Sequence, residues 1–388
     1  MDIWRWRPSV EKHSFRLLII VPVLLAIATA VTLFIHSDYN LVALYSQCHA
    51  HARLPSLSRL PLLGPPACYL VSFFKTAVSS ARAFAVMAEI LSFVAGLLTV
   101  YTVEGARICN LPNVLIAYPT GPLLIFNMIG GAFIWQLLII PAFFHRAKAI
   151  LKARGDARRG DETEVSPQDP NLGKDSRHLR DDSETIAIPV GVALGFILPS
   201  ILMIALATPT AVALWFFSPI YVTLIRKAVR AAVPYAKRLV AQASSTHEVQ
   251  SLHLESHRVS LALVYAAPVV CSALAHWLLI WRATTQKDDR LMMTRKTLGF
   301  IEIDIVFTGF TVLYWLLVEA GWRVVAVMVG VSVVLGPGAG VCAGWVYREG
   351  SWHEIFGRGL GREESTSSSS SSSEDREGGA DEQTPLLR

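Results

Sequence analysis

Long apolar runs recur along this chain, and they limit its fold more than any other feature. Most have about 18 to 25 residues, the length that an α-helix needs to cross a bilayer. They are Phe15–His36, Phe84–Tyr101, Pro122–Phe144, Ile186–Ala207, Ala211–Ile225, Val259–Trp281, Leu298–Glu319 and Val324–Tyr347. The shortest, 211–225, follows Pro209 and fits either a bent continuation of its predecessor or a re-entrant segment. We therefore expect an all-α polytopic membrane helix bundle of about eight transmembrane helices, within a range of seven to nine.

The composition agrees with a membrane protein, because 53% of the 388 residues are hydrophobic and only 17% are charged. Arg5, Arg7 and Lys12 precede the first apolar run, as in a signal peptide. That run is too long for a removed signal and lacks a convincing small-residue cleavage site, so it predicts a retained span. We expect a multi-pass protein of the endoplasmic reticulum.

The chain divides into a bundle and a tail. Residues 1–348 form the multi-span bundle, with a charged linker at about 146–185, and residues 349–388 form a disordered, Ser-rich, acidic tail. The tail closes with an acidic dileucine pattern that ends at Leu386 and Leu387, which indicates vacuolar sorting if the tail is cytoplasmic.

The loops carry the information on membrane orientation. Basic residues crowd 145–180 and 226–258, which places both stretches in the cytoplasm by the positive-inside rule, although the N-terminal charges argue the opposite for eight full spans. Residues 37–83 read as a semi-apolar loop that caps the bundle at one interface, with a ninth short crossing around Leu60–Phe74 as the alternative. A bridge between Cys48 and Cys68 is an option if this loop is lumenal.

One acid, Asp304, stands about a quarter of the way into the run 298–319. A carboxylate near a bilayer centre costs roughly 2.5–3.5 kcal/mol, so an acid at this depth faces protein or water and often has a chemical role. Removal from water favours the neutral, protonated form, a candidate Brønsted acid. The alternative is a packing acid that bonds to a Thr or Trp of another span.

Helical periodicity separates Asp304 from its neighbour Glu302. At 3.6 residues per turn, Asp304 shares its face with an aromatic and hydroxylated set, whereas Glu302 points nearly opposite and reads as an interfacial charge. The set is Phe300, Phe307, Thr308, Thr311 and Trp315.

Glu104 ends the second apolar run, and Arg107 follows it on the same helical face. Two interpretations stay open: an interfacial ion pair, or one wall of a pocket beside the polar turn that follows. In the third run, Asn127, the pair Gly130 and Gly131, and Trp135 predict close helix packing, with Trp135 also able to line a cavity.

Several site types are excluded or weak. The chain has no Walker loop, nucleotide fingerprint or aspartate-rich diphosphate motif, so we expect no cofactor and no nucleic-acid partner. His253, Glu255 and His257 lack an indicated further ligand, so no metal is expected. Basic residues are sparse within the spans, which disfavours an anion transporter.

Four short motifs resemble fungal integral-membrane terpene cyclases of meroterpenoid biosynthesis, of the ascochlorin and macrophorin type. They are Val103 to Asn110, Tyr118 to Gly121, Gly130 and Gly131 to Trp135, and Asp304 followed by Phe307 and Thr308. The resemblance covers most of residues 80–347. This chain is longer than the small cyclases, and Ile108 and Cys109 stand where those enzymes often have a more polar motif.

The resemblance implies an enzyme that protonates an epoxide or terminal alkene of a prenyl chain and needs two acids on separate spans. It places Glu104 and Asp304 in those roles, and we expect Arg107 to orient Glu104 while Trp135, Phe300, Phe307, Thr308 and Trp315 contact the substrate. The implied partner is a lipophilic prenylated small molecule that enters from the bilayer.

The alternative is a non-enzymatic polytopic protein, such as a transporter or receptor-like sensor, that uses its intramembrane acids for packing or proton coupling. A transporter should show paired broken helices and a pathway open to water. A cyclase should show a closed, aromatic-lined pocket joined to the lipid phase.

Overall fold

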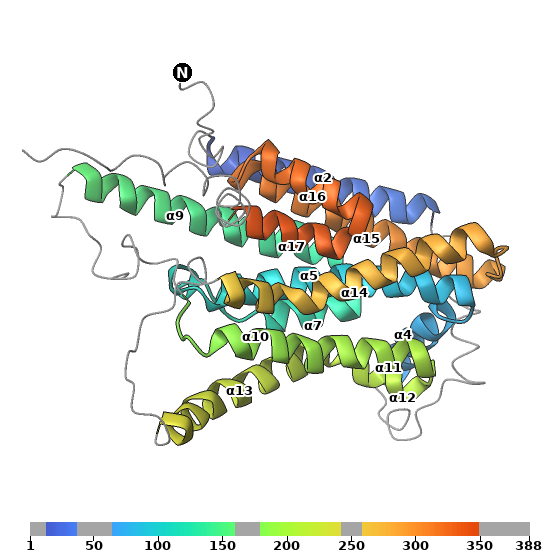
Figure 1. The fold of residues 1–388 in the computed structure, drawn as a ribbon. Helices are drawn as coiled ribbons and strands as arrows, with labels where there is room; N and C mark the ends of the chain where they lie inside the picture. Colours follow the sequence, from blue (N-terminus) through green and yellow to red (C-terminus); the bar gives the residue numbers. More distant parts are fainter. Residues whose placement is uncertain (1–12, 37–63, 160–178, 242–257, 349–388) are drawn as a thin grey trace, which may run out of the picture.

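The computed structural model describes residues 13–36, 64–159, 179–241 and 258–348 (Figure 1). Within these ranges all regular structure is helical, and the only β-type pairing is an isolated bridge between Arg107 and Leu179. The expected all-α bundle is confirmed.

The helices keep the order of the apolar runs, with several interruptions. They are α2 (Phe15–His36), α4 (Gly64–Ala77), α5 (Ala81–Ala106), η1 (Ile108–Asn110), α6 (Val114–Ala117), α7 (Thr120–Ile129), α8 (Gly131–Ile134), η2 (Trp135–Ile139), α9 (Ile140–Arg159), α10 (Glu184–Val192), η5 (Ala193–Ile197), α11 (Leu198–Leu206), α12 (Pro209–Phe216), α13 (Ser218–Ala241), α14 (Arg258–Thr285), α15 (Met292–Glu319), α16 (Trp322–Leu335) and α17 (Pro337–Arg348). Here η1 is a 3₁₀ turn, and η2 and η5 are π-helical turns inside longer helices.

Six helices of the described chain are long and apolar enough to cross a membrane, or up to seven if the bent pair α12 and α13 is one span. That pair bends by 60° near Phe217, inside the expected run 211–225. Helix α12 folds back on α11 instead of continuing it, since Trp215 donates to Ser200 at 3.0 Å, which agrees with the re-entrant alternative. The last expected span, 324–347, is a hairpin of two short helices, α16 and α17, which pack against each other and turn at Gly336. The uninterrupted count is therefore lower than eight because glycine and proline break the remaining apolar runs.

Helix α5 is the central element of the bundle. Of its most apolar window, 83% is buried, and α14, α17 and α10 pack around it. Contact with α17 is close because Gly96 and Gly338 carry no side chain where the two backbones meet. In Figure 1, α5 and α14 lie in the middle of the bundle, between α2 at one side and α10 to α13 at the other.

Two loop expectations change in the structure. Part of the stretch expected as a capping loop, 64–77, is the helix α4, which packs against α12 and α15. Helix α9 continues to Arg159, into the stretch expected as a linker. Residues 160–178 and the tail 349–388, with its dileucine pattern, lie outside the described residues.

Different helices mark the two ends of the bundle. The outward ends of α9 and α13 lie at one end, and α4 lies toward the opposite end (Figure 1). Cys68 in α4 is disulfide-bonded, whereas Cys48, the other member of the expected bridge, lies outside the described residues. Cys109, Cys271 and Cys342 are free.

The packing of α5 on α17 gives a first prediction. A Cβ on Gly338 would lie 2.4 Å from the carbonyl oxygen of Ser92, a backbone atom that cannot move away easily. Gly338→Ala should therefore destabilise the bundle by about 1–3 kcal/mol, measured as a lower thermal unfolding midpoint in detergent. Gly330→Ala is the matched control, because a Cβ there would have no neighbouring atom within 4 Å and alanine favours the helix. Equal midpoints for the two variants would contradict the close approach.

Candidate active site

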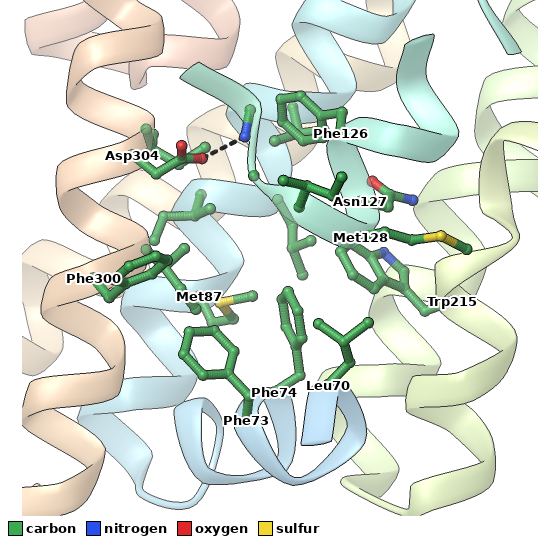
Figure 2. Close-up of a pocket in the computed structure, with 18 of the residues that line it drawn as sticks. Leu70, Phe73, Phe74, Met87, Phe126, Asn127, Met128, Trp215, Phe300 and Asp304 are labelled. Carbon is green, nitrogen blue, oxygen red and sulfur yellow. Dashed lines mark hydrogen bonds between the residues drawn. The ribbon is translucent and has the colours of Figure 1, made fainter. Parts of the chain in front are cut away.

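Asp304 lies on the buried face of α15 and is 7% exposed. Its neighbours Thr308, Thr311 and Trp315 are also buried, so the face predicted by periodicity is confirmed, whereas the side chain of Glu302 is 43% exposed and lies 3.9 Å from Arg290. The carboxyl of Asp304 accepts two backbone hydrogen bonds, from the N–H of Gly131 to Oδ2 at 2.7 Å and from the N–H of Ala132 to Oδ1 at 3.0 Å. Figure 2 shows the carboxyl turned toward this backbone.

The two donors are available because the third apolar run breaks at Gly130. Gly130 has φ 122° and ψ 157°, a conformation that residues with a side chain rarely adopt, and it separates α7 from α8. The first N–H groups of a helix have no partner within that helix, and an unpaired N–H in an apolar region is strongly unfavourable. Asp304 supplies the acceptor, so acid and helix break depend on each other.

A cavity of about 240 Å³ opens beside this contact (Figure 2). Helices α4, α5, α7, α8, α12 and α15 contribute to its wall, and most of the lining side chains are aromatic or aliphatic. The lining residues are Tyr69, Leu70, Phe73, Phe74, Met87, Ile90, Leu91, Val94, Phe126, Asn127, Met128, Ile129, Gly130, Gly131, Trp215, Phe300, Ile301, Asp304 and Ile305. Among the described residues that line it, Asp304 is the only carboxyl.

The aromatic side chains form two groups on the wall. Phe73 meets Phe300 edge-on at a centroid distance of 5.8 Å, and Phe74 lies 5.0 Å from Trp215. In Figure 2 these rings lie on the side of the cavity away from Asp304. The cavity therefore has one acidic pole and an aromatic floor.

The wall formed by the end of α7 reaches the outer surface. Met128 and Ile129 line the cavity, yet they are 38% and 69% exposed, and Ile125 on the same helix is 41% exposed. Helix α7 is a short apolar helix, and this outer surface is apolar. Side chains of α7 therefore separate the cavity from an apolar part of the molecular surface.

Asn127 adds a second polar group to the wall. Its Nδ2 donates to the carbonyl of Phe216 and to the hydroxyl of Ser218, both at 3.2 Å. These two bonds fix the amide plane, and within the described part of the chain its Oδ1 accepts no hydrogen bond. An acceptor of fixed orientation is therefore present on the wall of the cavity.

Glu104 does not line this cavity. Its carboxylate accepts hydrogen bonds from four side chains: Arg107 Nε at 3.0 Å, Asn110 Nδ2 at 3.1 Å, Trp345 Nε1 at 3.0 Å and Arg348 at 3.0 Å. It lies ten residues beyond Val94, the last cavity residue of α5, which is about 15 Å along the helix axis.

The ion pair of Glu104 with Arg107 that the sequence predicted is present, but the expected juxtaposition of Glu104 with Asp304 is not. Guanidinium groups of Arg107 and Arg348 donate to the carboxyl of Glu104 and occupy its Oε1. The structure favours the ion-pair interpretation that the sequence left open.

Of the other residues expected to contact the substrate, one lines the cavity. Phe300 lines the cavity, and Arg107, Trp135, Phe307, Thr308 and Trp315 do not. Trp135 packs on Trp315 at 6.1 Å, and Trp315 packs on Trp345 at 4.6 Å, in an aromatic row that leads to Glu104. Thr308 donates its hydroxyl to the backbone carbonyl of Asp304, and Phe307 packs against Phe310.

Sequence reasoning missed the floor of the cavity. Phe73 and Phe74 lie in the proline-containing stretch for which the sequence predicts a loop, although their place in an apolar run of fourteen residues, GPPACYLVSFFKTA, is a helical signal. Met87 and Trp215 have no distinguishing signal, because any apolar span contains such residues. For Asn127 the sequence predicts packing, and its place on the cavity wall could not be inferred.

The remaining polar groups bond between helices. Glu89 accepts from His276 Nδ1 at 2.8 Å, if that nitrogen carries the proton, so this pair bonds across α5 and α14. The described residues contain no cluster of three or more metal-ligating side chains, while His253, Glu255 and His257 lie outside them.

The helix break gives a second prediction. A Cβ on Gly130 would lie 3.2 Å from Asp304 Oδ1, and the backbone there has a glycine conformation. Gly130→Ala should cost about 1–3 kcal/mol of stability and displace the carboxyl. Gly121→Ala in the same helix, with no neighbour within 4 Å, is the control. Thermal unfolding in detergent measures both, and a neutral Gly130→Ala would show that the break tolerates a side chain.

Comparison with known proteins places the chain in a family. The CtvD domain model matches residues 19–287, which include the helix break at Gly130 and end before α15, the helix that carries Asp304. Neither the comparison with curated proteins nor that with solved structures gave a match. Because the match covers more than half of the sequence, the chain belongs to the CtvD domain family.

Proposed function

We propose that the protein is a membrane-bound terpene cyclase that starts a cationic cyclisation by protonating the epoxide or terminal alkene of a prenyl chain on a meroterpenoid precursor. The observation that carries the proposal is the cavity itself, in which one buried carboxyl faces an apolar, aromatic wall. Membership of the CtvD domain family and the resemblance to fungal cyclases support a biosynthetic role.

Asp304 is the proposed Brønsted acid. Its proton passes to the epoxide oxygen, the C–O bond breaks as the π electrons of a neighbouring alkene attack the carbon, and the oxygen becomes a hydroxyl. The negative charge left on Asp304 is stabilised by the N–H groups of Gly131 and Ala132 at the start of α8, without rearrangement. Proton transfer from a positioned acid contributes typically about 10²–10⁴-fold in rate.

The aromatic floor is suited to the cation that follows. Ring faces stabilise a nearby cation by about 0.5–2 kcal/mol each, and Phe73, Phe74 and Phe300 line the cavity together with Trp215. An apolar wall also excludes water, which would otherwise capture the cation before ring closure. The last cation loses a proton to the carboxylate of Asp304, so substrate and product are isomers and the enzyme regains its starting state.

The proposal retains one of the two acids that the resemblance implied. Glu104 is assigned to holding α5 against α17 through Trp345 and Arg348, because its oxygens have four partners and none of them lies in the cavity. The prenylated substrate would enter between side chains of α7 from the lipid phase. No cofactor is required for this chemistry.

We propose the endoplasmic reticulum as the site of action. The disulfide of Cys68 fits an oxidising lumen on the α4 side, and the basic ends of α9 and α13 fit the cytoplasm on the other side. The two criteria are independent and give the same orientation.

The transporter alternative has one observation in its favour, because two apolar runs are interrupted near the bundle interior, where the chain turns back at Gly130 and at Gly336. The cavity at the first break is however lined mainly by apolar side chains and has no row of polar groups leading to an aqueous surface. We therefore rank the cyclase first.

The proposal is tested with microsomes that express the chain and are fed an epoxyfarnesyl phenol. Asp304→Asn should lower cyclised product by about 10²-fold or more, because the amide has no proton to donate to the substrate. Glu302→Gln, two residues away on the exposed side, should keep normal activity. Product levels that are unchanged in Asp304→Asn would contradict the assigned acid.

A second pair of variants tests the cavity wall on the same helix. Phe300→Leu removes a ring from the wall and should slow cyclisation by about 2- to 30-fold, the loss of roughly 0.5–2 kcal/mol of cation stabilisation. Phe307→Leu removes a ring that does not line the cavity and should leave the rate unchanged. Equal rates for both variants would place the reaction elsewhere.

A further inference from the structure

Another cavity, also of about 240 Å³, lies where the end of α5 meets the starts of α7 and α10 and the middle of α13. It shares no lining residue with the cavity of Asp304. Its wall is formed by Gly105, Ala106, Leu111, Ala117, Tyr118, Pro119, Thr120, Arg180, Glu184, Thr223, Arg226, Lys227 and Arg230.

The charges on this wall do not balance. Glu184 is its only carboxylate among the described residues, and it is fully buried. Arg226 donates to both oxygens of Glu184, at 2.6 and 2.8 Å, and Arg230 donates to Oε1 at 3.2 Å. With Arg180 and Lys227, four cations thus face one anion.

Arg180 and Lys227 are the cations without a counterion. Both are exposed, and neither forms an ion pair within the described ranges. Asp181 and Asp182 follow Arg180 in the chain but do not line the cavity, and Asp181 accepts the N–H of Ser183 instead. Two positive charges therefore remain available to a ligand.

The backbone holds this wall in place. The N–H of Arg180 donates to the carbonyl of Ala106 at 3.0 Å, next to the bridge between Arg107 and Leu179. Thr120, the first residue of α7, lines the cavity and shares a hydrogen bond with Thr223, so the positive end of that helix adds to the field. The site is built before any ligand arrives.

We infer that this cavity binds a phosphate group through Arg180 and Lys227, with Arg226 and Arg230 behind them. Guanidinium and ammonium groups beside a helix start are the usual ligands of a phosphate. Lys227 and Arg230 lie on a span near its basic end, and Tyr118, 65% exposed, lies on the rim, as expected at the headgroup level of a membrane. The phosphate belongs to an anionic lipid headgroup or to free phosphate.

The test uses the full-length protein purified in detergent, with binding measured by native mass spectrometry against phosphatidic acid and phosphatidylcholine. Lys227→Gln should weaken phosphatidic acid binding about fivefold, and the double variant with Arg180→Gln about thirtyfold, since each basic residue contributes roughly 1 kcal/mol near an anionic surface. Both variants leave Arg226 and Arg230 to neutralise Glu184. Lys287→Gln, an exposed lysine outside this cavity, is the control with the same charge loss.

Competition with millimolar inorganic phosphate distinguishes the two sources. Displacement of the lipid, together with binding of phosphate alone in calorimetry, assigns the site to free phosphate, whereas failure to displace assigns it to a lipid headgroup. Wild-type affinity for phosphatidic acid in the double variant would overturn the inference, as would equal binding of phosphatidylcholine. Cyclase activity plays no part in these measurements.

Discussion

The pairing of Asp304 with the start of α8 is the interaction on which the arrangement of the site depends. A break in a membrane helix exposes backbone donors that lipid cannot satisfy, so the break survives only where protein supplies acceptors. Asp304 does so with two short hydrogen bonds. The chain turns back at Gly130, since α7 starts beside Gly105 and α9 returns to Asn113 at Ala142, and the end of α7 forms part of the wall of the cavity. The same carboxyl thus supports the cavity and faces into it.

The second break, at Gly336, shows that such a helix interruption does not by itself indicate a chemical site. There Ser272 closes the gap with its hydroxyl, which donates to the carbonyl of Leu335 and accepts the N–H of Ala339. Glu89 lies nearby but is paired with His276. A neutral hydroxyl is therefore sufficient to pair the backbone at this turn between two helices. The use of a carboxyl at Gly130, beside a cavity, is what suggests a role beyond structure.

Local features of the site could be predicted from sequence, and features that depend on helix offsets could not. Periodicity places Asp304 inside and Glu302 outside, and the spacing of Glu104 and Arg107 predicts their ion pair, because both depend on one helix only. Whether two acids on different spans meet depends on how far one helix is shifted along its axis relative to the other. Residue spacing within a single helix carries no information about this shift. The aromatic floor on α4 was hidden for a different reason, since prolines at the start of that helix resemble a loop.

The buried ion pairs lie away from the cavity of Asp304, which leaves the wall of that cavity mainly apolar. Glu104, with Arg107 and Arg348, and Glu184, with Arg226 and Arg230, lie toward the basic end, where α5 finishes and α10 begins. Buried ion pairs are tolerated there because each carboxylate has several donors. The half of the bundle that holds Asp304 contains no such pair on the wall of its cavity. Along α5, about 15 Å of helix separates Glu104 from Val94, the last cavity residue of that helix, so its two guanidinium partners would not repel a cation formed in the cavity, as the proposed chemistry needs.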